Sequence, residues 1–150
     1  MELDAETIEY AHRMFDLARS GHTEELAAQV GAGLPVNLTD ARGNTLLILA
    51  AYHGCTGTVR ALVRRGADVN RVNDHGQTAL GSALFKQDAD AVRVLLDAGA
   101  DPDLGEQSAR ATAAFFGLAE MAELLPPASP LPPAPPPPAA PPTRPSDSAH

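Results

Sequence analysis

Cysteine, tryptophan and aromatic side chains in general are scarce in this sequence of 150 residues. A single cysteine, Cys55, excludes an internal disulfide and any zinc site built from a cluster of cysteines. Tryptophan is absent and aromatic residues make up only 4% of the chain, although hydrophobic residues reach 44%. A core of this composition consists mainly of Ala, Leu and Val, which suits closely packed short helices better than a thick β-sandwich.

Basic residues are also few, and almost all of them are arginine. Lys86 is the only lysine beside ten arginines, and the formal net charge is -8. Proteins that bind nucleic acids usually present a basic face that displaces counterions, so the sequence predicts no nucleic-acid partner. The scarcity of lysine beside abundant Ala, Pro and Gly favours a bacterial source with a GC-rich genome.

Long hydrophobic runs are missing as well. No apolar segment approaches the roughly 20 residues needed to span a bilayer, so no membrane partner is predicted. The first six residues are acidic and lack both the basic region and the apolar run of a secretory signal peptide. We therefore expect a soluble, cytoplasmic, monomeric protein.

The sequence instead has internal repetition at a spacing of 33 residues. The segment 66–70, Gly-Ala-Asp-Val-Asn, returns at 99–103 as Gly-Ala-Asp-Pro-Asp. A degenerate copy, Gly-Leu-Pro-Val-Asn, precedes both at 33–37. The segment 43–47, Gly-Asn-Thr-Leu-Leu, keeps the same step and returns at 76–80 as Gly-Gln-Thr-Ala-Leu. Self-similarity at a fixed period of this size indicates a solenoid of stacked units.

Within each unit the pattern predicts two short antiparallel helices joined by a tight turn. Apolar residues recur at helical spacing, and Thr23, Thr45 and Thr78 each stand where a helix N-cap is expected. The expected helices are 5–19, 24–30, 46–53, 58–65, 79–86, 89–98 and 119–125, with a further one that contains 113–116.

Glycines mark the turns between these helices. Gly66 follows a helix at the place where a left-handed backbone is commonest, and a bulky residue there should cost about 1 kcal/mol or more. Gln87 stands where the preceding unit has the inter-helix Gly54. We therefore expect this one turn to be slightly strained.

These landmarks together resemble the ankyrin repeat: a turn, Gly-x-Thr-x-Leu, paired alanines, an inter-helix glycine, then Gly-Ala-Asp-Val-Asn. The resemblance implies an all-α solenoid of stacked ankyrin repeats within residues 1–125, similar to small stand-alone bacterial ankyrin proteins. About four units are expected, the first and last degenerate caps: 5–37, 38–70, 71–103 and 104–125. The family's Thr-Pro-Leu-His is replaced by Thr-Leu-Leu-Ile and Thr-Ala-Leu-Gly, so weaker helix starts are expected, most of all around Gly81.

The composition changes abruptly after the last unit. Twelve of the 25 residues from Pro126 to His150 are proline, and most of the rest are Ala and Ser. Such a segment cannot form a hydrogen-bonded ladder or bury enough surface to offset the entropy of ordering. The sequence therefore predicts a disordered, Pro/Ala-rich tail over 126–150.

No arrangement of residues with catalytic or ligand-binding spacing is present. The five histidines have no metal-ligand spacing, and the glycines follow the repeat period rather than a phosphate-binding pattern. Cys55 is interpreted as a partly buried thiol, and Arg60, Arg64 and Arg65 as a solvent-facing stripe or a contact for an acidic partner. The sequence predicts a protein without catalytic activity, cofactor or metal.

A candidate binding surface follows from the resemblance, because the end of each first helix faces the concave groove in ankyrin stacks. Four of the six aromatic residues of the chain fall in this one row, next to a histidine and the lysine. Aromatic anchors beside cations are typical of binding hot spots. The turn tips would form the opposite wall of the groove. The predicted protein-binding residues are Arg42, Tyr52, His53, His75, Phe85, Lys86, Phe115 and Phe116.

Tyr52 and Phe85 are the predicted anchors; an alternative for Phe115 and Phe116 is that they fill the degenerate last unit against the tail. The function predicted is a non-catalytic module, an adaptor or regulator, that binds a protein partner in the groove. In a second hypothesis the repeats are a passive scaffold whose proline-rich tail recruits the partner. An enzyme, and self-association through the exposed end near Leu124 and Leu125, remain further alternatives.

Overall fold

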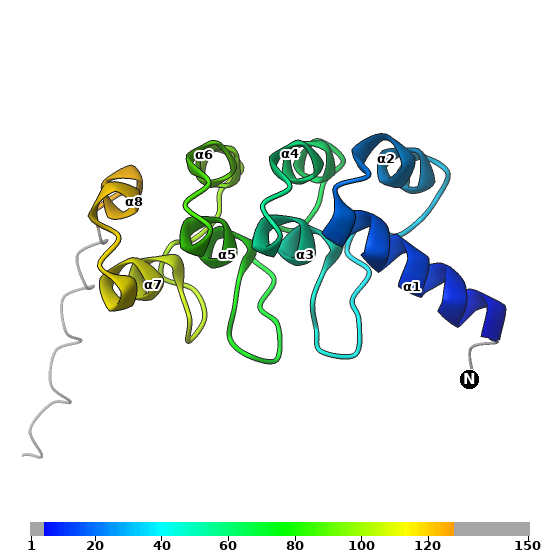
Figure 1. Cartoon of the computed structure of the whole chain (residues 1–150), viewed down its shortest axis with the longest axis horizontal. Helices are drawn as coiled ribbons and strands as arrows, with labels where there is room; N and C mark the ends of the chain where they lie inside the picture. The colour runs from blue at the N-terminus through cyan, green and yellow to red at the C-terminus, as the bar shows by residue number, and fades with distance from the viewer. Residues whose placement is uncertain (1–4, 128–150) are drawn as a thin grey trace, which may run out of the picture.

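The computed structural model describes residues 5–127 as a row of helices stacked side by side (Figure 1). The helices of this part are α1 (Ala5–Ser20), α2 (Thr23–Gly31), α3 (Leu46–Tyr52), α4 (Thr56–Arg64), α5 (Ala79–Phe85), α6 (Ala89–Asp97), α7 (Ala109–Phe116) and α8 (Ala119–Leu124). The first helices of the pairs (α1, α3, α5, α7) form one layer and the second helices (α2, α4, α6, α8) form the other. Long loops extend from the first layer, away from the second. This is an all-α solenoid, as the repeat predicts.

The core runs continuously through the stack and consists of small and medium-sized aliphatic side chains. The helix α3 is buried along almost its whole length, from Leu46 to Ala51. Ala50 and its counterpart Ala83 are 0% exposed, so neighbouring helices can approach closely at these positions. Among residues 5–127, Phe15 is the only aromatic residue buried in this core. One helix pair could not bury such a stripe alone, whereas stacked pairs share it.

Threonine caps start the central first helices. The Oγ1 atoms of Thr45 and Thr78 accept hydrogen bonds from the backbone N–H groups of Ile48 and Gly81, both at 3.1 Å. Both caps were predicted, and they show that the helix starts are satisfied without the proline and histidine of the family pattern. The prediction for Thr23 is wrong, because it is the first residue of α2 rather than its N-cap.

The hydroxyl of Thr23 has a partner in the next unit instead. Its Oγ1 atom lies 2.7 Å from the Oγ1 atom of the buried Thr58, so the two hydroxyls join α2 to α4. The helix α4 also begins at Thr56, two residues earlier than expected, because Gly54 (φ +73°) completes the turn at once. The remaining helix ends lie within a residue or so of the predicted ones.

Two turn predictions are confirmed by the backbone angles. Gly66 adopts the left-handed region with φ +88°. Gln87 does the same with φ 58°, and it is the only residue other than glycine with a positive φ in the described part of the chain. The turn between α5 and α6 is therefore strained in the way that the missing glycine predicts.

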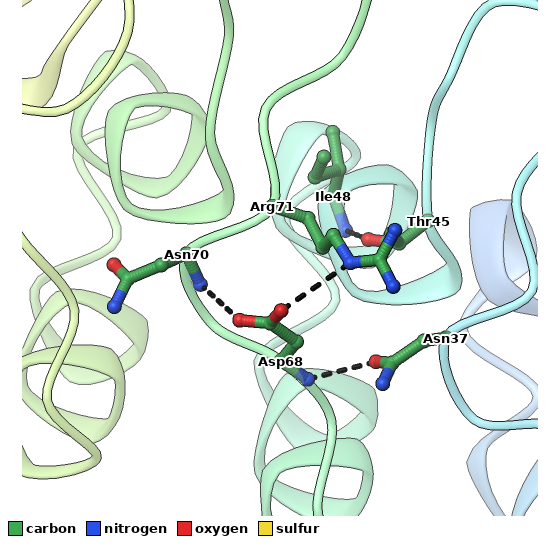
Figure 2. Close-up of polar contacts among 6 residues, drawn as sticks. All are labelled: Asn37, Thr45, Ile48, Asp68, Asn70 and Arg71. Atoms are coloured by element: carbon green, nitrogen blue, oxygen red, sulfur yellow. Dashed lines mark hydrogen bonds and ion pairs between the residues drawn. The ribbon is translucent and has the colours of Figure 1, made fainter.

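The repeated Gly-Ala-Asp-Val-Asn segment ties each unit to the next. The Asp68 carboxylate accepts a hydrogen bond from the Asn70 N–H at 2.9 Å and forms an ion pair with Arg71 (Figure 2). The Asp68 N–H donates a hydrogen bond to Asn37 Oδ1 at 2.8 Å. One unit later Asn70 Oδ1 accepts from the Asp101 N–H, also at 2.8 Å. The aspartate thus holds its own turn, and the asparagine holds the turn of the following unit.

The loop of the last unit contacts the turn and the first helix of the third unit directly. The Gln107 N–H donates to Gly76 O at 2.9 Å, and the Gln107 side chain donates to His75 O at 2.8 Å. A Cβ atom at position 81 would lie 2.9 Å from Gln107 O. Gly81, which departs from the family pattern, therefore makes room for this loop.

The structure describes only part of the predicted end segments of the chain. Residues 1–4 and 128–150 lie outside the described part, so the predicted tail stays a prediction. Between residues 5 and 127, no helix combines the length and the apolarity needed to cross a membrane.

Candidate functional site

Two adjoining cavities lie between the first helices and the loops, and we call them together the inner groove. The larger, of about 740 Å³, lies between α1, α3 and the loop segments 40–44 and 75–77. The smaller, of about 240 Å³, lies between the ends of α3, α5 and α7. Tyr52 lines both cavities and so joins them into one surface. This surface lies where the concave groove is expected.

The structure brings most of the predicted binding residues together here. Tyr52, His53, Arg42 and His75 line the larger cavity. Phe85 and Phe116 line the smaller one with Tyr52. The two other predicted residues lie beside the groove, since Lys86 Nζ is 5.6 Å from the Tyr52 ring centroid and Phe115 contacts Phe116.

Exposed aromatic rings form a row along this surface. Tyr52 is 41% exposed, Phe85 42%, Phe116 52% and Phe115 82%. The Phe85 and Phe116 centroids lie 5.1 Å apart, and those of Phe115 and Phe116 lie 4.9 Å apart, both edge to face. Within residues 5–127 none of these rings is buried. The alternative packing of Phe115 and Phe116 against the tail involves residues outside the described part.

Two cations and an imidazole alternate with the rings along the ends of the first helices. Arg19 lies in the last turn of α1, while His53 and Lys86 directly follow α3 and α5. Burial, together with the positive charges of Arg19 and Lys86, lowers the pKa of His53 below its usual value. Lys86 also places its ammonium group within cation–π distance of Tyr52, so it bridges two units.

The opposite wall is built from two stacked loops, each closed by hydrogen bonds within its own turn. Asp40 Oδ1 accepts hydrogen bonds from the N–H groups of Arg42 and Asn44, both at 2.9 Å. Asn73 repeats the arrangement one unit later and accepts from the N–H groups of His75 and Gln77 at 2.9 Å. The amide of Asn73 also donates to the Asn44 side chain at 2.7 Å, which joins the two loops.

The carboxylate of Asp40 is committed to its own turn. Burial alone would raise the pKa of Asp40, but the hydrogen bonds from Asn44 and Arg42 and the charge of Arg19 outweigh it, so the pKa is lowered. Asp40 is therefore ionised at neutral pH and keeps the loop tip in place.

Several lining residues were not predicted from the sequence. Among them are His12, Asp16, Gln107 and Thr112. Gln107 occupies the register of Asn44 and Gln77 once the three residues lost from the last unit are counted, so this signal was present. His12 and Asp16 lie on α1. This helix is longer than the other first helices, and no earlier unit precedes it for comparison in the sequence.

Metal-ligating and nucleophilic side chains were the other features to locate in the described part of the molecule. Between residues 5 and 127, no three His, Cys, Asp or Glu side chains are placed together to hold a metal ion. Burial and the nearby charge of Asp88 raise the pKa of Cys55, so its thiol is protonated at neutral pH. A protonated thiol is a poor nucleophile. What the groove offers a ligand is exposed rings, cations and hydrogen-bonding loop tips.

Helix pairs stacked around a shared core, with loops that wall an open groove, define a repeat-built scaffold for binding. A family model of ankyrin repeats, in three copies, matches residues 14–106, and the chain belongs to the ankyrin-repeat family. Ankyrin repeats are generally protein–protein interaction modules.

Comparison with individual proteins agrees with this assignment. An ankyrin repeat protein of Pseudomonas aeruginosa is 51% identical over 59 residues, which span 39% of this chain and 34% of that protein. The crystal structure of the human ASB11 ankyrin repeat domain superposes with a TM-score of 0.67 at 31% identity, over 74% of this chain. The chain covers 51% of the ASB11 chain, so it matches only a part of each of these relatives.

Proposed function

We propose that this protein is a non-catalytic adaptor or regulator that binds a partner protein in the inner groove. Tyr52 and Phe85 act as the anchors, and Phe116 extends the apolar surface toward the last unit. Arg42, His53, His75 and Lys86 set the polarity of the site. Phe115 contributes at the edge.

The observation that carries this proposal is the row of exposed rings in the groove. Large aromatic side chains that stay more than 40% exposed leave apolar surface in water, although the chain has only six aromatic residues in all. Binding a partner removes that surface from water, and rings of this kind dominate the binding energy at interfaces. The hydrogen bonds within and between the loops opposite favour a preformed site, which lowers the entropic cost of binding.

The test is affinity capture from a lysate of the source organism, followed by mass spectrometry. Wild type is compared with the double variant Tyr52→Ala/Phe85→Ala. We expect proteins captured by wild type to be lost with the variant, because two anchors are worth roughly 2 kcal/mol or more each at an interface. Equal capture of every protein by both would contradict the proposal.

The matched control is Arg60→Ala/Arg64→Ala, two exposed residues on the outer helix α4. This variant should capture the same proteins as wild type. Circular dichroism and thermal unfolding establish that both variants are folded, which is expected because none of the four side chains belongs to the core.

A further inference from the structure

The inner groove carries a small excess of positive charge although the whole chain is acidic. The formal net charge of the protein is -8 with neutral histidines. The larger cavity is lined by two arginines, Arg19 and Arg42, and by two carboxylates, Asp16 and Asp40, and Lys86 adds a cation at the junction of the two cavities, so the excess is one positive charge. The basic and imidazole side chains concerned are His12, Arg19, Arg42, His53, His75 and Lys86.

Both groove carboxylates already have partners. Asp16 pairs with Arg19 at 2.8 Å. The oxygens of Asp40 accept three hydrogen bonds from its own turn, from the N–H groups of Arg42 and Asn44 and from the Asn44 amide. Among residues 5–127, by contrast, neither Arg42 nor Lys86 takes part in an ion pair. The positive charges of Arg42 and Lys86 are therefore not paired with a carboxylate within the described part of the protein.

The pKa of His53 supports this conclusion. Besides burial, it is the charges of Arg19 and Lys86 that lower this pKa, and these charges come from the helices on either side. A positive potential thus extends across three successive units at the level of the exposed rings. A ligand that supplies carboxylates would relieve this repulsion.

The spacing of the two cations and of the His53 imidazole between them determines which shape of ligand fits. Neighbouring packed helices lie about 8–10 Å apart, so Arg19, His53 and Lys86 come from points separated by about this distance along the stack. An extended polyproline-type backbone advances about 3.1 Å per residue and presents every third residue on the same side, at a repeat of about 9 Å. Carboxylates at every third position would therefore meet successive units.

We propose that the inner groove recognises an extended acidic segment of a partner protein, with carboxylates at about every third residue. The carboxylates contact Arg19, His53 and Lys86, and apolar side chains between them cover Tyr52, Phe85 and Phe116. Like charges disfavour a basic segment, so the groove discriminates by charge as well as by apolar contact. This inference rests on the proposed function, because it names the partner chemistry of the same groove.

The experiment measures binding of synthetic probes to the full chain by fluorescence anisotropy. The first probe is a fluorescein-labelled twelve-residue peptide of four Glu-Leu-Pro repeats, whose prolines favour the extended backbone, and the second is its Gln-Leu-Pro counterpart. We expect the Glu probe to bind about tenfold more tightly, since several partly exposed charge pairs add up to an effect of this size. The advantage should shrink as NaCl is raised from about 50 to about 500 mM.

Variants locate the effect. The substitution Lys86→Gln should lower the affinity for the Glu probe about threefold and leave the affinity for the Gln probe unchanged. Arg64→Gln on the outer face of α4 makes the same change of net charge, and it should alter neither affinity beyond a small long-range effect that salt removes. A third probe, a peptide of residues 128–150, reports whether the proline-rich segment itself prefers the groove.

Three outcomes would overturn the inference: equal affinity for the Glu and Gln probes, no binding of either probe, or tighter binding of the 128–150 peptide than of the Glu probe. None of these contradicts the proposed function. That proposal fails only if Tyr52→Ala/Phe85→Ala captures the same proteins as wild type, so the two failures are distinguishable.

Discussion

Gln87 carries backbone strain at a position where a glycine would carry none. Its φ is 58°, whereas the equivalent turns after α1, α3 and α7 have Gly21, Gly54 and Gly117 with φ from 64° to 74°. Gln87→Gly should therefore increase the free energy of unfolding by about 0.5–1 kcal/mol, since relief of strain outweighs the extra entropy of glycine in the unfolded chain. Urea denaturation measures the change.

The reciprocal control is Gly54→Gln. No atom lies within 4 Å of the Cβ position at Gly54, so any loss comes from the backbone conformation alone. We expect a loss of about 1–2 kcal/mol. If both substitutions left stability unchanged, the account of these turns would be wrong.

His53 is the second residue-scale case, because its charge depends on its neighbours. The pKa of His53 in the folded protein lies below its usual value, so the unfolded chain binds a proton at this side chain more readily than the folded protein does. The free energy of unfolding therefore decreases as the pH falls below about 6.5. Lys86→Gln removes one of the repelling charges and should raise the pKa. Titration of the His53 ring protons by NMR measures this. An unchanged or lowered pKa in the variant would show that Lys86 does not act on His53.

At the scale of elements, the helix α5 contains a glycine, Gly81, at a position where helix propensity alone would favour alanine. An alanine in an exposed helix interior usually gains about 1 kcal/mol over glycine. At Gly81, however, the added Cβ would lie 2.9 Å from Gln107 O. Gly81→Ala should therefore destabilise the protein by about 1–2 kcal/mol, since the loop of the last unit must shift.

Gly57 in α4 provides the matched control. The nearest atom to a Cβ there is Thr23 Oγ1 at 3.6 Å, which is an ordinary contact. Gly57→Ala should be neutral or stabilising by up to about 1 kcal/mol in the same urea experiment. The same sign for both alanine substitutions would contradict the close approach at Gly81.

The elements that could be predicted are those whose causes are local. Thr45 and Thr78 cap helices that begin at the next residue, and Gly66 ends one, so the order of residues is sufficient. Thr23 was assigned wrongly because its partner Thr58 is 35 residues away. The role of Gly81 was likewise hidden, since it depends on how the shortened last unit packs.

The site follows the same division. The repeat register was enough to place Tyr52 and Phe85 at the open ends of first helices. It did not identify Gln107, because the deletion in the last unit shifts the register, or His12, which lies on a helix without an earlier copy. The cationic character of the groove also had to come from the structure, since it depends on Asp40 and Asp16 being engaged by neighbours.

At the scale of the whole molecule, stability should be uneven along the stack. The helix α8 has six residues, no unit within the described part follows it, and Phe115 near the end of α7 is 82% exposed. The central helices α3 to α6 have a unit on each side. In hydrogen exchange followed by mass spectrometry, amides of residues 109–124 should exchange faster than those of residues 46–64. Uniform exchange, or earlier opening of the centre, would contradict a stack held by neighbour contacts.

The central claim is that the inner groove, and no other face, receives the partner. The most direct measurement is site-specific photo-crosslinking in the source organism, with p-benzoylphenylalanine in place of Phe85, of Arg64 on the outer face, or of Ala139 in the proline-rich segment. The account predicts a discrete crosslinked protein from position 85 and none from position 64 or 139. Crosslinks from position 64 or 139, with none from position 85, would contradict it.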